Sequence, residues 1–275
     1  MPRHKLDINI GLLKNLYYER GLSFNKMGKL MGCSRDTIRN RLKEHNLPFK
    51  TKSAAHTKYK KKSFDGDEAT RSYLVGFRLG DLSVRKPYKN SHIVVVSCHT
   101  TTFYQVRLFR KLFGEYGKIY VYKSPRPSFN MNCYLDESFS FLLSKNIAFW
   151  FRKRNAHPIT FIAGYVDAEG SFGINQGRAR FKIDAYDYKI LKFINKKLSR
   201  LGVKTKFRRI AKKGTKSYKR DNPWNKDLWR LDVNEANSLL KFIKIIMPYI
   251  KHRKRISDAK ICIKNILKRK QNGTI

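Results

Sequence analysis

Two segments of this 275-residue chain repeat one pattern of apolar, small and acidic residues, 88 positions apart. The first segment is YLVGFRLGDLSV, which begins at Tyr73, and the second is FIAGYVDAEGSF, which begins at Phe161. A period of this length is typical of a duplicated domain, because the units of a solenoid are shorter. The repeat therefore predicts two related halves.

The elements expected after each segment follow the same order. After the first segment, the residue patterns predict a hairpin, a helix, a strand pair and a helix, at 83–100, 103–116, 118–135 and 138–145. After the second segment the same order is expected at 171–186, 188–201, 203–233 and 235–247, with a further helix beyond Pro248. Each half is thus predicted to be αββαββα. The fold class is α+β, with halves at residues 70–157 and 158–275.

Each repeated segment is expected to form a helix with one bare side. Small residues stand four positions apart on it, Gly76 with Gly80 and Gly164 with Ala168. Such faces allow two helices to cross with their backbones nearly in contact. The four residues are therefore predicted to be helix-packing positions.

Contact between these helices would bring their acidic ends, Asp81 and Glu169, together. Each carboxylate would face the negative end of a helix macrodipole, and the two would repel each other. Hard divalent cations such as Mg²⁺ bind through few carboxylates plus a substrate phosphate. In a two-metal phosphodiesterase the ions activate a water and stabilise the leaving oxygen. Asp81 and Glu169 are thus predicted to be metal ligands and catalytic residues.

The net charge of +41 indicates a polyanionic partner, with nucleic acid as the leading candidate. Hydrophobic residues make up 41% of the chain, which is enough to fill real cores, so a disordered basic chain is excluded. A ribosomal-type RNA binder and an anionic-membrane protein are the alternatives. The sequence shows no continuous apolar span of about 20 residues, which argues against the membrane alternative. The scattered cysteines form no CxxC pair, which indicates neither zinc nor disulfides and an intracellular, reducing compartment.

Basic residues alternate with apolar ones in the strands expected in the second half. Because side chains alternate across a strand, they should form one cationic face shaped for a phosphate backbone and groove. These candidate DNA-binding residues are Arg178, Arg180, Lys182, Lys204, Lys206 and Arg208. In the first half, Lys118, Tyr120 and Tyr122 form a milder version. Lysine also protects exposed strand edges from aggregation, but this does not explain arginine at central positions.

The first fifty residues predict three short helices, with Ser23 and Ser34 as N-caps of the second and third. The stretch GLSFNKMGKLMGCSRDTIRNRLKEHNLP resembles the helix-turn-helix of DNA invertases and resolvases. By that resemblance, the start of the third helix would reach base edges in a major groove. The side chains concerned are Arg35, Asp36, Thr37, Arg39 and Asn40. A small three-helix cap with a solvated basic face is the alternative. Residues 1–50 are therefore assigned to a helix-turn-helix domain, and residues 51–69 to a basic linker.

The two repeated segments also resemble a known family. FIAGYVDAEGSF (residues 161–172) is similar to a strong LAGLIDADG motif, and LVGFRLGDLSV (residues 74–84) to a weaker one. The resemblance extends over residues 70–275 and implies a monomeric, two-motif LAGLIDADG homing endonuclease. It implies a saddle-shaped antiparallel sheet in the major groove and cleavage of both strands across the minor groove, which leaves short 3′ overhangs. By this resemblance, Asp81 and Glu169 would be the metal-binding catalytic pair.

The first motif departs from the family pattern at two positions. Leu79 replaces the usual first acid and Leu82 replaces the closing glycine, whereas Asp167 and Gly170 are both present in the second motif. If the two halves differ, the first half is therefore expected to be the weaker one.

The family also places polar or basic residues near the end of the second strand and near the start of the last helix. His99 follows Cys98 at the first place, where the other half has Ala185. An ordinary surface histidine is an alternative interpretation of His99. At the second place, the candidate is Arg253, chosen among neighbouring lysines.

These expectations lead to a Mg²⁺-dependent, site-specific double-strand DNA endonuclease that acts on a long target, is monomeric and is intracellular. Cytoplasm or nucleoid is expected, with an organelle left open. An intron RNA maturase, or a helix-turn-helix transcription regulator that uses the fold for binding, is the alternative. Intact acids argue against lost catalysis, but maturases can keep both acids, so intron RNA stays open as a partner. A recombinase is disfavoured, because no serine or tyrosine nucleophile stands in a domain of its own.

Overall fold

The computed structural model describes residues 8–50, 61–123, 127–147, 157–216 and 222–275, and its chain divides into two compact units. The first unit ends at Lys60 and the second begins at Lys61. Each unit has its own hydrophobic core.

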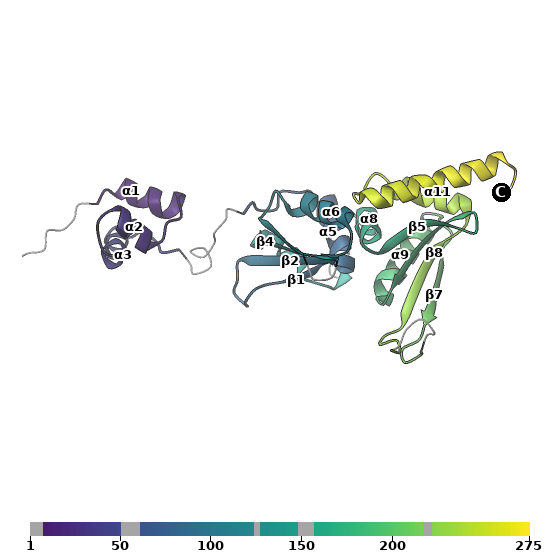
Figure 1. Cartoon of the computed structure of the whole chain (residues 1–275), viewed down its shortest axis with the longest axis horizontal. Coiled ribbons are helices and arrows are strands. Elements are labelled where there is room, and N and C mark those ends of the chain that lie inside the picture. Colours follow the sequence, from purple (N-terminus) through teal and green to yellow (C-terminus); the bar gives the residue numbers. More distant parts are fainter. Residues whose placement is uncertain (1–7, 51–60, 124–126, 148–156, 217–221) are drawn as a thin grey trace, which may run out of the picture. The chain divides into compact units, whose positions relative to one another are not determined.

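The first unit is all helical (Figure 1). Its elements are α1 (Ile10–Lys14), the π-helix η1 (Asn15–Glu19), α2 (Phe24–Leu30) and α3 (Arg35–Glu44). Both expected serine caps are present, because Ser23 Oγ accepts from the backbone N–H of Lys26 and Ser34 Oγ from that of Thr37. Leu13, Met27 and other apolar residues fill the core between the helices.

The turn between α2 and α3 depends on Gly28. A Cβ at this position would lie 2.5 Å from the carbonyl oxygen of Cys33, which is backbone and cannot yield. Gly32, in the turn itself, has φ +65°, a conformation that glycine adopts without steric cost. The close packing of α2 on the start of α3 is therefore built into the sequence.

The second unit consists of two halves with the same sheet topology (Figure 1). Strand order is β1-β2-β4-β3 in one antiparallel sheet and β5-β6-β8-β7 in the other. The first half contains α5 (Glu68–Asp81), β1 (Ser83–Arg85), β2 (Ile93–Thr100), α6 (Phe103–Phe113), β3 (Ile119–Lys123), β4 (Phe129–Asp136) and the 3₁₀ helix η2 (Glu137–Leu142). The second half contains α8 (Pro158–Glu169), β5 (Gly170–Asn175), β6 (Arg178–Ala185), α9 (Tyr188–Arg200), β7 (Lys206–Ala211), β8 (Leu228–Val233), α10 (Ala236–Ile246) and α11 (Arg253–Gln271). The predicted α+β fold of tandem, related halves with an all-α N-terminal part is confirmed.

Three expected boundaries differ from the structure. The helix expected at 138–145 is the 3₁₀ helix η2, whose three residues per turn place Phe139 and Leu142 on the same buried side. The strand expected from Val203 begins at Lys206, so Lys204 precedes it. Residues 61–69, expected in the linker, belong to the second unit, where Phe64 packs against Phe139. The remaining linker residues, 51–60, lie outside the described residues.

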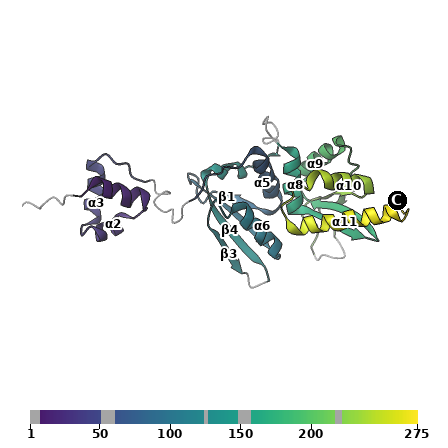
Figure 2. The same cartoon turned by 90° about the horizontal axis from the view of Figure 1, so that it is seen from above.

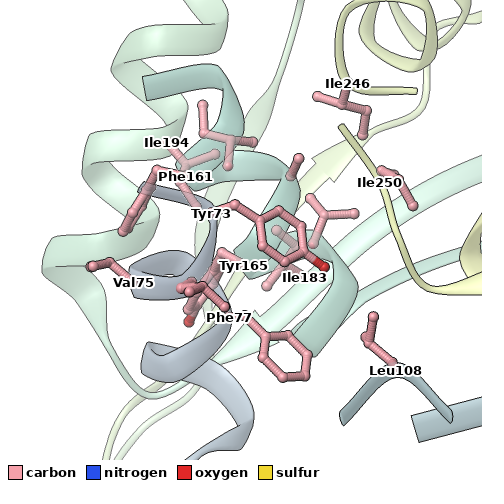
Figure 3. Close-up of a cluster of buried hydrophobic side chains, with 14 of the residues drawn as sticks. Tyr73, Val75, Phe77, Leu108, Phe161, Tyr165, Ile183, Ile194, Ile246 and Ile250 are labelled. Carbon is pink, nitrogen blue, oxygen red and sulfur yellow. The ribbon is translucent and has the colours of Figure 1, made fainter. Parts of the chain in front are cut away.

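Helices α5 and α8 cross with their backbones in contact, at the centre of the second unit. A Cβ on Gly76 would lie 2.0 Å from the carbonyl oxygen of Phe161, and one on Gly164 would lie 2.1 Å from that of Tyr73. Figure 2 shows the two helices side by side between the two halves, and Figure 3 shows Tyr73 and Phe77 of α5 packed among Phe161 and Tyr165 of α8. The last residues of the two helices are thereby brought to one place.

Helix α11 lies along one face of the second sheet, where it contacts β5 and β6 (Figure 1). Ala259, Cys262 and Ile266 form its buried stripe. The opposite face of that sheet is open. In the part of the chain that is described, no helix has the length and apolarity needed to span a membrane.

Candidate active site and nucleic-acid face

Asp81 and Glu169 are the last residues of α5 and α8. The ends of the two helices lie close together, because a Cβ on Gly80 would lie 2.5 Å from the Cβ of Ala168 and 2.9 Å from the Cγ of Glu169, and the charge of Glu169 reaches Asp81. The four small residues predicted to pack the helices therefore lie at the crossing of α5 and α8, and the two acids follow directly after it.

The two carboxylates are costly to ionise together. Burial, and then the charge of Glu169, raises the pKa of Asp81 to about 7, while a hydrogen bond from Gln105 and the charge of Arg255 oppose that rise. Gln105 Nε2 donates to Asp81 Oδ2 at 2.5 Å. Burial also raises the pKa of Glu169, against the lowering effect of Arg255. Carboxyl groups with raised pKa values mark this place as a candidate functional site.

Arg255 is the cation whose charge reaches both acids, although the sequence favoured Arg253. Arg253 is the first residue of α11 and is exposed. Arg255 is half-buried and lies on the same helical stripe as Ala259 and Cys262. Helical phase was the signal that could have selected it, since positions i, i+4 and i+7 share one face.

His99 and Cys98 point to opposite sides of the first sheet, because they are neighbours on β2. His99 is exposed, and its Nε2 is 3.1 Å from Ser128 Oγ. Cys98 is buried on the side of the acids, where burial and the charge of Asp81 raise its pKa to about 12. The structure does not bring His99 to Asp81. Gln105 takes that place instead. It is the polar residue on the otherwise apolar buried face of α6, and sequence reasoning missed it.

Asp167, the first acid of the second motif, has a structural role. Its Oδ2 accepts from Tyr73 Oη at 2.6 Å and from the backbone N–H groups of Lys251 and His252 at 2.7 and 3.0 Å. The carboxylate thus anchors the start of α11 to the crossing of α5 and α8, near the positive end of a helix dipole. Leu79 occupies the matching place in the first motif, where the hydrophobic core accommodates it.

The residues present fit a divalent cation. Asp81 and Glu169 supply hard oxygen ligands whose ionisation is resisted by burial and mutual repulsion, and a bound cation would relieve both effects. Within the described ranges, no group of three or more histidine, cysteine, aspartate or glutamate side chains gathers to hold a metal. Water and a phosphate would therefore have to complete the ligand set, as is common for Mg²⁺.

The open face of the second sheet carries charges of both signs. Along β6 the residues Ala179, Phe181 and Ile183 are buried against the helices, so Arg178, Arg180 and Lys182 lie on the open face, as expected. The strand register then sets six charged residues in two rows across β6, β8 and β7. The first row is Lys182, Asp232 and Lys206, and the second is Asp184, Arg230 and Arg208.

The sequence predicted a purely cationic face, and this prediction is wrong because the face also carries acidic side chains. Arg208 forms an ion pair with Asp232, and Lys182 lies 3.5 Å from Asp184. Arg230 donates two hydrogen bonds to Asp184. Asp184 and Asp232 were missed because the expected alternation was followed only for basic residues, and Arg230 was missed because β8 was not separated within the strand pair expected at 203–233. Lys204 is exposed but precedes β7.

The open face of the first sheet carries tyrosine and asparagine side chains. Tyr120 and Tyr122 stack with ring centroids 6.4 Å apart, and Tyr134 meets Tyr120 edge to face. The register pairs these tyrosines with Asn130 and Asn132 on β4. The two halves thus present different chemistry on equivalent faces.

On α3 of the first unit, Arg35, Asp36, Arg39 and Asn40 are exposed, on the side away from the buried Ile38. Thr37 is half-buried, and its hydroxyl lies 2.9 Å from Ser34 Oγ. The structure leaves the four exposed side chains accessible and engages Thr37 in the cap of the helix.

Comparison with known proteins places these observations in context. The family model of the LAGLIDADG-like domain matches residues 157–247, so the second half contains a domain of this kind. The homing endonuclease I-WcaI, solved bound to its DNA recognition sequence, aligns with a TM-score of 0.50 and 13% identity, over 78% of this chain and 97% of that one. At this identity the likeness shows a shared fold. No curated protein sequence matches the chain.

Two further solved structures align with lower scores. The homing endonuclease I-DmoI, in complex with DNA and Mn, has a TM-score of 0.45 and 18% identity, over 66% of this chain and 97% of that one. Full-length WhiA from Thermatoga maritima has a TM-score of 0.46 and 14% identity, over 76% of this chain and 63% of that one.

Proposed function

We propose that the protein is a site-specific, double-strand DNA endonuclease that uses divalent metal ions, with Mg²⁺ as the physiological ion. The observation that carries the proposal is the pair of half-buried carboxylates at the neighbouring ends of the crossed helices, each with a raised pKa. Such a pair serves hydrolysis of phosphodiesters, because bound ions supply a water nucleophile and stabilise the leaving oxygen. The sequence likeness in the second half, together with the fold shared with I-WcaI, supports the same activity.

In this proposal, the residues of the site have separate roles. Asp81 and Glu169 hold the ions, and the amide of Gln105 orients the Asp81 carboxylate through its hydrogen bond. The charge of Arg255 opposes the rise in the pKa of both acids and so favours their ionised forms. The open faces of the two sheets take up double-stranded DNA, and their different chemistry suits an asymmetric target read by a monomer.

The proposal also assigns a role to each part of the chain. Residues 1–50 form a helix-turn-helix module that extends the target, residues 51–60 connect it to the second unit, and residues 61–157 and 158–275 are the two LAGLIDADG halves. A cap at the start of α3 and the exposed Arg35 and Arg39 support the first assignment.

The test is cleavage of a site selected from randomised DNA. With Mg²⁺, the protein should break both strands, and Glu169→Gln should abolish cleavage while binding is kept. Glu137→Gln is the matched control, because that exposed acid pairs with Lys86 and His92 away from the site. Normal cleavage by Glu169→Gln would refute the proposal. Tight, specific binding without cleavage by the natural protein would favour the alternative of a regulator, and binding to intron RNA that of a maturase.

A further inference from the structure

The side chain of Arg230 is held along one edge by Asp184. Arg230 Nε donates to Asp184 Oδ1 at 2.5 Å, and Arg230 Nη2 donates to Asp184 Oδ2 at 2.7 Å. The two residues are also direct partners in the pairing of β6 with β8. A planar guanidinium has five N–H donors, so this contact leaves the edge formed by Nη1 and Nη2 for another ligand.

Arg230 faces a hollow in the open face of the second sheet. The hollow has a volume of 370 Å³, and its lining includes Arg180, Lys182, Arg208, Arg230 and Asp232. Asp184 does not line it, so it holds Arg230 from outside the hollow. Because β8 lies between β6 and β7, Arg230 stands in the middle of the face and not at its rim.

Arg208 is held in a similar way. Its Nη1 pairs with Asp232, whose own exposure is 4%. Fixing an arginine by a neighbouring carboxylate lowers the conformational entropy that it loses when it binds a ligand. It also lowers the local positive potential. A surface selected for phosphate affinity alone would gain nothing from these aspartates, because phosphate contact depends on positive charge.

A fixed guanidinium fork suits a ligand with two acceptors at a set spacing. In the major groove, guanine presents O6 and N7 in this arrangement, and arginine to guanine is the commonest specific contact. We propose that Arg230, oriented by Asp184, recognises one guanine in the half of the target that the second sheet contacts. This inference rests on the proposed double-stranded DNA substrate and deepens it. Asp184 is a positioning residue, because it acts through Arg230.

The experiment selects bound sequences from randomised duplex DNA without divalent metal, so that its result is independent of cleavage. The variants are Arg230→Lys, which keeps the charge but loses the fork, and Asp184→Asn, which releases the fork. Both should lose preference at the same single G·C position, by about tenfold or more. The double variant should lose no more than either single variant, because both changes disable one contact.

Arg209→Lys is the matched control. Arg209 is also held by an aspartate, since its Nη1 lies 3.1 Å from Asp227 Oδ2. Because it is the neighbour of Arg208 on β7, its side chain points to the other face of the sheet, where its guanidinium lies 5.9 Å from the Trp229 ring. This variant should keep the full preference of the natural protein. Thermal unfolding of every variant identifies a change that acts through stability instead.

Three results would overturn the inference: an unchanged preference, equal weakening at all positions, or loss of preference at different positions in the two variants. Equal weakening would show that Arg230 contacts phosphate. Failure of the proposed nuclease activity is seen separately, as absence of cleavage of the selected site by the natural protein with Mg²⁺. A position-specific result would still stand in that case.

Discussion

Asp81 is the residue at which the demands of folding and of the proposed chemistry conflict most clearly. Its carboxylate is buried beside Glu169, and its pKa is raised to about 7. In the unfolded chain the same group ionises near pH 4. Between these values the folded protein binds more protons than the unfolded chain, so the free energy of unfolding falls as pH rises. A bound divalent cation would remove this penalty.

Asp81→Asn should therefore stabilise the metal-free protein at pH 8, by about 2–4 kcal/mol, because the amide keeps the shape without the buried charge. The gain should shrink as pH falls and be nearly lost at pH 4, where the carboxyl is protonated in the folded protein and about half protonated in the unfolded chain. Chemical denaturation with EDTA, repeated between pH 4 and pH 8, measures it. Some slope should remain, since the pKa of Asp167 is also raised, to about 6.

Asp227→Asn should change the free energy of unfolding in the opposite direction. Hydrogen bonds from the backbone N–H of Lys213 and from Arg209 lower the pKa of this half-exposed carboxyl, so its ionised form favours the folded state. Its replacement should slightly destabilise the protein above pH 4. A stability of Asp81→Asn equal to that of the natural protein at pH 8 would mean that the carboxylate carries no electrostatic strain.

Arg255 and Arg253 differ by two positions in the chain and should differ sharply in effect. The charge of Arg255 lowers the pKa of Asp81 and Glu169, and removing it should raise both. We expect the rising limb of the pH profile of cleavage to move up, by about one unit, in Arg255→Gln. Arg253→Gln, which removes an equal charge from an exposed position, should leave the limb in place. Equal shifts in both variants would assign the effect to net charge.

At the scale of elements, the crossing of α5 and α8 determines where the acids lie. Gly164 has no room for a methyl group, because the atom nearest to an added Cβ is a backbone oxygen 2.1 Å away. Gly164→Ala must push the helices apart, so we expect it to destabilise the fold by about 3 kcal/mol and to reduce cleavage. Gly173→Ala is the matched control, since nothing lies within 4 Å of its added Cβ. Thermal unfolding and cleavage rates check both, and a stable, active Gly164→Ala would contradict close contact.

The elements show what sequence periodicity predicts well. The 88-residue repeat and the small residues led to the paired helices and to the place of Asp81 and Glu169, because these patterns are local and recur in register. Strand alternation correctly placed the basic residues of β6 on the open face.

Other features depend on contacts between distant parts of the chain, which periodicity does not specify. Gln105 reaches Asp81 from α6, and Asp167 caps the start of α11, 84 positions away from its partner Lys251. The ion pairs of Asp184 and Asp232 depend on the pairing of β8 with β6 and β7, which the sequence did not reveal. The choice between Arg253 and Arg255 required the phase of α11 relative to its buried stripe.

At the scale of the whole molecule, the net charge of +41 means that much of the affinity for the proposed nucleic-acid partner would be unspecific and sensitive to salt. Loss of affinity alone therefore does not show whether a residue contacts bases or phosphates. The first and second units should be distinguished by how their variants affect sequence preference, protected length and salt dependence, which report different kinds of contact.

Arg35→Gln with Arg39→Gln should test the first unit as a reader of bases. Both side chains are exposed one turn apart at the start of α3, where a recognition helix meets base edges. In the full-length protein, this double variant should lose sequence preference at one end of the target and protect a shorter stretch of DNA from nuclease digestion. Cleavage at saturating protein should continue at the natural rate, because the acids belong to the second unit.

Lys26→Gln with Lys29→Gln removes the same charge from exposed positions of α2. If α2 contacts phosphates, this control should weaken binding equally for all sequences and reduce the dependence of log K on log salt by about two. The arginine variant should instead change which bases are preferred. Identical sequence preferences and footprints in the two double variants would mean that the first unit adds charge alone. In that case the three helices would be a basic cap, and specificity would reside wholly in the two sheets.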